Sequence, residues 1–157
     1  MVIEFLSVKQ LLMKQLNDAY SLNEEMSFKV SVANLTQEEA SWQINGDTWS
    51  IEQIIFHIAS SVIEYCKQGF GTWDKEYDKP IDDISSMIDL SDKAFNHLME
   101  QITSLDDFFL FDPIDTKSHG ESGAHFFWMM IMHYITHAAQ IRTIRRAYGP
   151  RTDYYPI

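Results

Sequence analysis

The sequence predicts an all-α fold, a four-helix bundle with long loops between helices 1 and 2 and between helices 3 and 4. Four segments repeat apolar residues with the period of about 3.6 residues that places them on one face of a helix. Each proline marks a limit of these segments, at positions 80, 113, 150 and 156. No alternation of apolar and polar residues is long enough to predict a β-strand.

The length and composition predict a single domain over residues 1–157. The chain has 157 residues, 45% hydrophobic content and one cysteine. A chain of this size buries enough apolar surface to fold without disulfides or a structural metal. Any metal site is therefore expected to serve function rather than folding.

The first helix is expected from about Phe5 to Leu22. Its apolar positions fall on one broad face, which consists of Val8, Leu11, Leu12, Leu16, Ala19 and Tyr20. Its polar side is expected to carry Lys9, Lys14 and Asp18. A polar connection follows over residues 23–47, within which residues 35–40 are candidates for a short helix.

The second helix has a well-marked start and end. Ser50 and Gln53 have the spacing of a capping box, and glycines 69 and 71 end the helix. Its apolar stripe consists of Ile51, Ile54, Ile55, Ile58, Val62 and Cys66. An acidic and aromatic loop over residues 70–80 comes next.

The third helix is expected from about Asp82 to Thr103, with Asp82 and Asp83 at its positive N-terminal end. Its apolar face consists of Ile84, Met87, Ile88, Phe95, Leu98 and Ile102. Residues 104–123 contain an apolar cluster, a proline and two glycines, and they predict a packed loop or a small hairpin.

The fourth helix is expected from Gly123 to Tyr148, and it ends at Gly149 before a proline. Its apolar stripe is Phe126, Met130, His133, His137, Ile141, Ile144 and Tyr148. Three arginines, at positions 142, 145 and 146, lie in its last turns, where positive charge favourably meets the negative end of the helix dipole.

Charge and composition exclude several classes of function. Twelve basic residues against 23 acidic ones give a net charge of -11, which repels nucleic acid and anionic lipid. The longest apolar run, Phe126–Met132, is too short to cross a membrane. A single cysteine and the lack of a recognisable signal peptide lead us to expect a cytoplasmic protein. The sequence also lacks a P-loop, a dinucleotide fingerprint, GxSxG, HExxH and the Glu-x-x-His pairs of di-iron bundles.

Two of the six histidines have the spacing of metal ligands. His133 and His137 are four residues apart, so their side chains point about 40° from each other and lie one turn apart. Both belong to the apolar stripe and are expected to face the bundle interior. Without partners, each buried ring nitrogen would cost roughly 1–3 kcal/mol. A shared metal ion would satisfy them, and so would hydroxyl groups or buried water.

A third ligand must come from another helix, and His57 is the candidate because it flanks the apolar stripe of the second helix. Glu64 projects in nearly the same direction and is a candidate to orient a ligand or a bound water, although a solvated surface position is the alternative. Cys66 points about 180° away from His57 and is interpreted as a core residue.

Two local motifs resemble the DinB and YfiT-like superfamily of four-helix bundle metalloenzymes. Residues 48–58, TWSIEQIIFHI, are similar to the family segment in which TWS and hydrophobic residues precede a histidine. Residues 132–141, MHYITHAAQI, are similar to the last-helix HxxxH followed by glutamine, here Gln140. The motifs differ at Ala138, where many members have another histidine or an arginine.

The resemblance implies that His57, His133 and His137 bind one divalent metal with water in the remaining positions, and that Gln140 supports the site. It also implies a homodimer and a reaction like those of relatives that use low-molecular-weight thiols such as bacillithiol or mycothiol. The family name does not imply DNA binding.

The resulting expectation is a metal-dependent enzyme with zinc or nickel on three histidines and an open position for a small-molecule substrate. Thiol S-transfer is the first choice of reaction and metal-assisted hydrolysis the second. The alternative is a non-catalytic bundle, structural or metal-binding, that acts as a dimer in stress response or partner binding.

Overall fold

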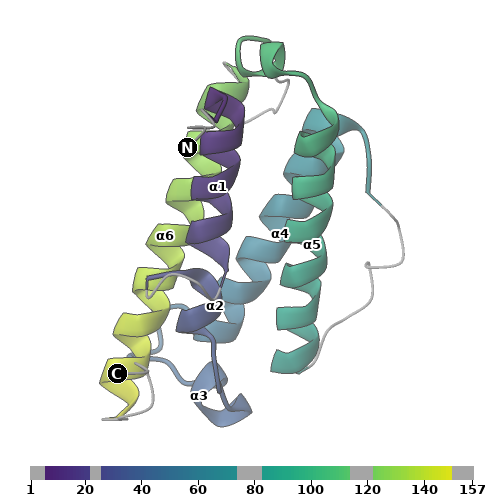
Figure 1. Ribbon diagram of the computed structural model, residues 1–157. Coiled ribbons are helices and arrows are strands. Elements are labelled where there is room, and N and C mark those ends of the chain that lie inside the picture. Colours follow the sequence, from purple (N-terminus) through teal and green to yellow (C-terminus); the bar gives the residue numbers. More distant parts are fainter. Residues whose placement is uncertain (1–5, 22–25, 74–82, 114–121, 150–157) are drawn as a thin grey trace.

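The computed structural model describes residues 6–21, 26–73, 83–113 and 122–149, and these residues are helical with no strand among them. The long helices are α1 (Val8–Tyr20), α4 (Ile51–Phe70), α5 (Ile84–Ser104) and α6 (Gly123–Tyr148). The short ones are α2 (Phe28–Ser31), α3 (Gln37–Ser41) and the 3-10 helix η2 (Asp107–Leu110). The predicted all-α bundle is confirmed, with its long connections after the first and third long helices (Figure 1). No described helix combines the length and apolar character that a bilayer crossing requires.

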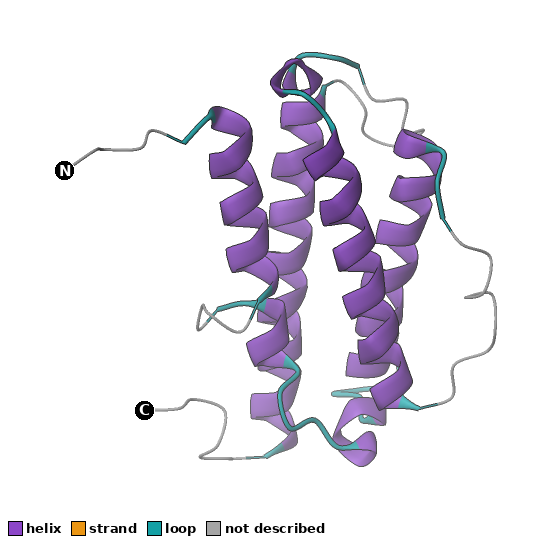
Figure 2. Ribbon diagram, turned by 45° about the vertical axis from the view of Figure 1, so that its right-hand side comes forward, coloured by secondary structure: helices purple, strands orange, loops and turns teal. Residues whose placement is uncertain are grey.

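The long helices lie side by side and pack in pairs (Figure 2). α4 packs mainly on α5, α1 packs mainly on α6, and contacts between α4 and α6 join the two pairs. α3 lies at the end of the bundle where α4 begins and α6 ends, and η2 lies at the opposite end (Figure 1). The seam between α4 and α6 therefore brings together segments that are far apart in the sequence.

Side-chain caps define where α1 and α4 begin. The Ser50 hydroxyl accepts a hydrogen bond from the Gln53 backbone N–H at 3.3 Å, and the Ser50 N–H donates to the Gln53 side chain at 2.8 Å. This is the predicted capping box. Ser7 and Gln10 form the same arrangement, with the same two distances, ahead of α1. α1 therefore begins at Val8, later than expected. The predicted limits of the first helix, Phe5 and Leu22, lie outside the described residues, and so does Asp82, the predicted start of the third helix.

Gly71 ends α4 in the left-handed conformation, with φ of 68°, and its N–H donates to the Lys67 carbonyl. A side chain at this φ is strained, so glycine is the favoured residue here. Gly69 lies inside the helix. Gly149 follows α6 as predicted, but it is extended, with φ of 173°.

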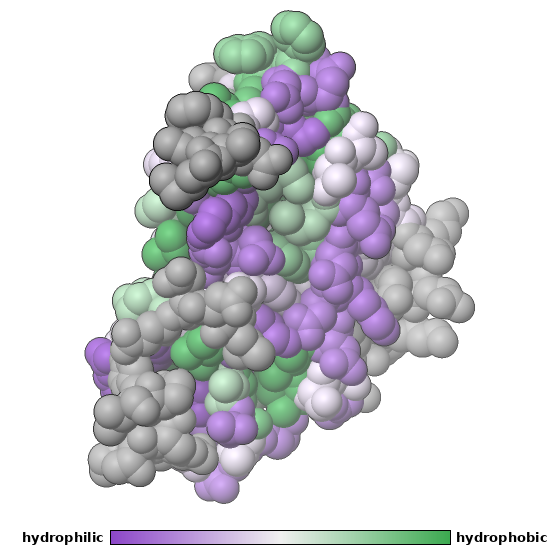
Figure 3. Space-filling model, in the orientation of Figure 1, coloured by the Kyte–Doolittle hydropathy of each residue, from purple (hydrophilic) through white to green (hydrophobic). Residues whose placement is uncertain are grey.

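The predicted apolar stripe of α4 is buried along its whole length. Of the predicted α5 face, four residues are buried and Met87 and Ile88 are half-buried. The stripes meet in one core whose largest fully buried side chains include Leu16, Phe28, Ile55, Ile58, Leu98, Ile102, Phe127 and Tyr134. Figure 3 shows hydrophilic side chains over the outward surfaces of α1 and α5, with apolar side chains between these two helices.

The prediction for the first turn of α1 is wrong. Val8 and Leu11, which were expected to be buried, are 65% and 46% exposed, whereas Lys9 is buried. The Lys9 ammonium donates hydrogen bonds to the backbone carbonyls of Thr103 and Leu105. These carbonyls lie at the C-terminal end of α5, where a helix leaves acceptors unsatisfied and carries partial negative charge. Lys9 thus caps a neighbouring helix, a role that its own helix period does not indicate.

The connection before α6 contains η2, and its described part is not a hairpin. Phe109 and Leu110 pack into the core, while Phe108 and Phe111 are exposed. Gly123 lies directly against this turn: a Cβ at position 123 would lie 2.2 Å from the Phe109 carbonyl oxygen. The first residue of α6 must therefore lack a side chain for η2 to pack as it does.

The interpretation of the Arg142–Arg146 cluster as simple dipole stabilisation is incomplete, because Arg145 is buried. Its guanidinium Nε lies 2.8 Å from Oε1 of Glu39, and both side chains are almost fully buried. The same guanidinium donates to the carbonyls of Ser31 and Ala33 at 2.8 and 3.0 Å. Glu39 belongs to α3, the short helix predicted within residues 35–40. Arg145 therefore ties α2 and α3 to the end of α6.

Candidate metal centre

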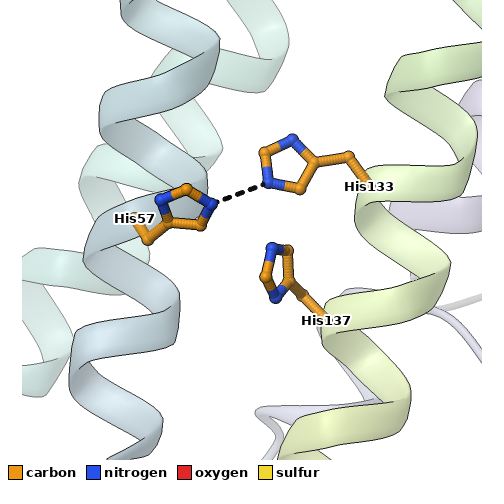
Figure 4. A group of neighbouring side chains, drawn as sticks. All are labelled: His57, His133 and His137. Atoms are coloured by element: carbon orange, nitrogen blue, oxygen red, sulfur yellow. Dashed lines mark hydrogen bonds between the residues drawn. The ribbon is translucent and has the colours of Figure 1, made fainter. Parts of the chain in front are cut away.

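The three predicted ligands converge in the seam between α4 and α6. His57 comes from the middle of α4, and His133 and His137 lie one turn apart on α6. One ring nitrogen of each lies within 4.8 Å of the others. Figure 4 shows all three imidazoles pointing into the same space between the two helices. Among the described residues, this is the group of histidine, cysteine, aspartate and glutamate side chains whose geometry suits a metal ion.

The distance between two of these nitrogens fits a tetrahedral metal site. Nε2 of His57 lies 3.3 Å from Nε2 of His133 (Figure 4). Zinc binds imidazole nitrogen at about 2.0–2.1 Å, so two ligands at a tetrahedral angle are separated by about 3.3–3.4 Å. The ligand nitrogen of His137 lies within 4.8 Å of the other two nitrogens. Each of these distances therefore exceeds the tetrahedral separation by at most about 1.5 Å. A divalent ion could therefore be held with small side-chain movements.

Gln140 is placed to orient His137. Its side-chain oxygen lies 2.7 Å from Nδ1 of His137. Because this oxygen can only accept, Nδ1 carries the hydrogen, and the lone pair of the neutral ring is on Nε2. That nitrogen points toward the other two rings (Figure 4). An outer partner of this kind sets the tautomer and direction of a histidine ligand.

His57 is held between a serine and a tryptophan. The Ser61 hydroxyl lies 3.5 Å from its Nδ1, and the Trp49 ring packs on the imidazole with centroids 5.1 Å apart. These contacts leave Nε2 of His57 directed at His133. Trp49 carries no ligand signal in the sequence, although it stands inside the TWS motif, directly before the cap of α4.

The surroundings favour the neutral form of the imidazoles. Burial lowers the pKa of His57 below its ordinary value. Burial also lowers the pKa of His137, and nearby His57 lowers it further, while the bond to Gln140 opposes the shift. Since neutral imidazole is the form that binds a metal, both shifts increase the fraction of ligand available near neutral pH.

The histidines are half-buried, which corrects the expectation that they lie within the buried stripe of α6. The fully buried positions near them are Tyr134 and Ala138, each one residue farther along the chain. The helix is therefore rotated so that His133 and His137 lie at the edge of the core, facing α4. Partial exposure also leaves a route by which an ion or a small molecule can reach the rings.

The structure does not bring Glu64 to the histidines. Its side chain is exposed, and its carboxylate accepts a hydrogen bond from Gln68 at 2.6 Å, one turn farther from His57 along α4. Glu64 is therefore a solvated surface residue, the alternative to a role in orienting a ligand. Cys66 is fully buried, as predicted, and burial raises the pKa of its thiol to about 12.

The other histidines have different surroundings. His97 is half-buried; its Nε2 lies 3.2 Å from the Thr72 hydroxyl, and its ring packs on Trp73. The His125 ring packs on Trp128, with centroids 5.8 Å apart. His119 lies outside the described residues.

Comparison with known proteins identifies the family. The family model of the DinB family matches residues 13–154, which include all three histidines of the cluster and nearly all of the bundle. No curated protein and no solved structure matched the sequence. A match over this share of the chain, together with the helical bundle, shows that the protein belongs to the DinB family.

Proposed function

We propose that this protein is a metal-dependent enzyme in which His57, His133 and His137 hold one divalent ion, with zinc or nickel as the first candidates. The convergence of three imidazole nitrogens from two helices carries the proposal. Three neutral ligands leave at least one coordination position for substrate and do not offset the charge of the ion. When bound, the ion would act as a Lewis acid that lowers the pKa of a thiol or water or polarises a carbonyl.

The chain's own residues prepare this site in three ways. Gln140 keeps the hydrogen of His137 on Nδ1 and so presents Nε2. Trp49 covers one side of His57 and reduces its contact with water. The rings are half-buried, so water is partly removed from them while a small molecule can still reach them.

Thiol S-transfer is the reaction that we propose first. A low-molecular-weight thiol gives its proton to solvent, its sulfur forms a bond to an electrophilic carbon of the acceptor, and the leaving group departs with the bonding electron pair. The family membership supports this choice, and metal-assisted hydrolysis is the second choice. We also propose that the enzyme acts on small molecules rather than nucleic acid or membranes, as a homodimer in the cytoplasm.

Metal content tests the site directly. Elemental mass spectrometry of tag-free protein should find one ion per chain in the wild type and none in His57→Ala or His133→Ala. His97→Ala removes a histidine from elsewhere in the fold and should keep the ion. A wild-type protein that takes up no zinc, nickel or manganese would refute the three-histidine site.

Cobalt substitution separates the enzyme from a non-catalytic bundle. If the site has an open position, adding a small thiol should change the visible spectrum of the cobalt protein, because sulfur enters the coordination sphere. A saturated site would not respond, and the non-catalytic alternative would then become the leading interpretation.

A further inference from the structure

A cleft lies beside the three histidines, between the start of α4 and the C-terminal half of α6. Its volume is about 700 Å³, which is within the range of pockets that bind small organic molecules. Ile54 and Ile144, both buried, form its inner part. The more exposed side chains of Ile44, Trp49 and Ile135 form its rim.

The lining of this cleft is mainly apolar and carries no charge. No charged side chain among the described residues lines it, and its polar groups are the side chains of Thr48, Thr136, Thr143 and Gln140. A charged group placed there would lose water without gaining an ionic partner, so its binding is disfavoured. An alkyl or aryl group would instead exchange water for apolar contacts. The chemistry of the cleft thus selects an uncharged apolar occupant.

Two residues that line the cleft also contact the histidine cluster. Trp49 lines the cleft and packs on the His57 ring, and Gln140 lines the cleft and contacts Nδ1 of His137. Thr136, the residue before His137, also lines it. A molecule in the cleft would therefore lie next to the side chains that contact His57 and His137.

We propose that this cleft binds an uncharged alkyl or aryl group of the substrate and places the reactive end of the same molecule at the three histidines. The statement about the reactive end rests on the proposed metal-dependent function, whereas binding of the apolar group does not. The enzyme accordingly discriminates among substrates by the apolar part they carry. Each methylene that enters the cleft strengthens binding by about fourfold, the factor that corresponds to about 0.8 kcal/mol.

The neutral fluorescent probe N-phenyl-1-naphthylamine tests the cleft on the full chain, both as purified and after metal removal by chelation. We expect one probe per chain, displaced by 1-butanol, 1-pentanol and 1-hexanol with inhibition constants that fall about fourfold for each methylene. Butyrate, which has a similar chain but carries a charge, should compete at least tenfold more weakly than 1-butanol. Equal competition by butyrate would overturn the proposal.

A matched pair of variants locates the probe. Ile135 lines the cleft and is 38% exposed, and Met132 is 41% exposed on the same helix but outside the lining. Ile135→Lys should weaken probe binding at least tenfold, and Met132→Lys should change it less than twofold. Wild-type binding in Ile135→Lys would show that the probe binds elsewhere. A change from dimer to monomer in sedimentation of Ile135→Lys would show that a second copy of the chain covers the cleft, and it would also overturn the proposal.

The metal content of the same two variants distinguishes a failure of the apolar cleft from a failure of the metal-dependent function. Both variants should retain one ion per chain, because neither residue is among the three histidines. Probe binding in a wild-type protein that takes up no metal would refute the metal-dependent function and retain the apolar cleft. An intact metal site without probe binding would refute the cleft alone.

Discussion

Replacing Arg145 should destabilise the protein far more than replacing its neighbour Arg146. In Arg145→Met, the carboxylate of Glu39 would remain buried without the guanidinium that lies 2.8 Å away. The carbonyls of Ser31 and Ala33 would lose their hydrogen bonds from the same group. Breaking a buried ion pair on one side costs about 3–5 kcal/mol. A protein of this size has a total free energy of unfolding of about 5–15 kcal/mol, so the loss is a large part of it.

The exposed residue Arg146 is the matched control, because it lies in the same last turn of α6. Arg146→Met removes the same charge from the negative end of the helix dipole, an effect of about 0.3–1 kcal/mol. We expect Arg145→Met to lower the melting temperature by about 6–20 °C and Arg146→Met by no more than about 4 °C. Urea unfolding followed by circular dichroism gives the two free energies.

Equal free-energy losses in the two variants would refute this reasoning and restore the simple dipole interpretation of the arginine cluster. A double variant, Glu39→Met with Arg145→Met, provides a further check. It removes both buried charges, so it should be more stable than Arg145→Met alone.

Three further predictions follow from local features. Gly123→Ala should lower the free energy of unfolding by about 1–3 kcal/mol, because the added Cβ meets the Phe109 carbonyl. Gly149→Ala should lower it less, because a Cβ at position 149 has open space around it. Equal losses in urea unfolding would contradict this. Because the pKa values of His57 and His137 are lowered in the folded protein, the unfolded chain binds more protons than the folded one below about pH 6.5. The free energy of unfolding of the metal-free protein should therefore fall as the pH is lowered from 7 to 5. The fall should be smaller in a variant with glutamine at both positions. The thiol of Cys66, with its pKa raised to about 12 and no exposure, should react with Ellman's reagent at pH 8 at least about 1000-fold more slowly in the native protein than in urea; a fast native reaction would contradict its burial.

Much of the fold follows from local patterns. The Ser50 capping box and Gly71 give the limits of α4, and the apolar period identifies the face of that helix that is buried. These features act within a few residues of chain, so the sequence displays them directly. The spacing of His133 and His137 has the same local origin, since a helix places residues four apart on one side.

Features that depend on contacts between helices were predicted poorly. The period of α1 suggested an exposed Lys9, yet the end of α5 lies beside it and supplies acceptors for its ammonium. Arg145 looked like a surface cation because its partner, Glu39, is separated from it by about two thirds of the chain. Glu64 shares a helix direction with His57, but its carboxylate bonds to Gln68 instead of approaching the ligands.

The sequence by itself determined the four long helices, most of their apolar faces and the histidine pair on α6, because each is set by the rotation of about 100° per residue within one helix. Only the tertiary structure decided the distance of 3.3 Å between His57 and His133, the burial of Arg145 against Glu39 and the apolar cleft beside the histidines. These depend on how far α4 and α6 are shifted and rotated against each other. Packing of the whole core sets that arrangement, and no short stretch of sequence encodes it.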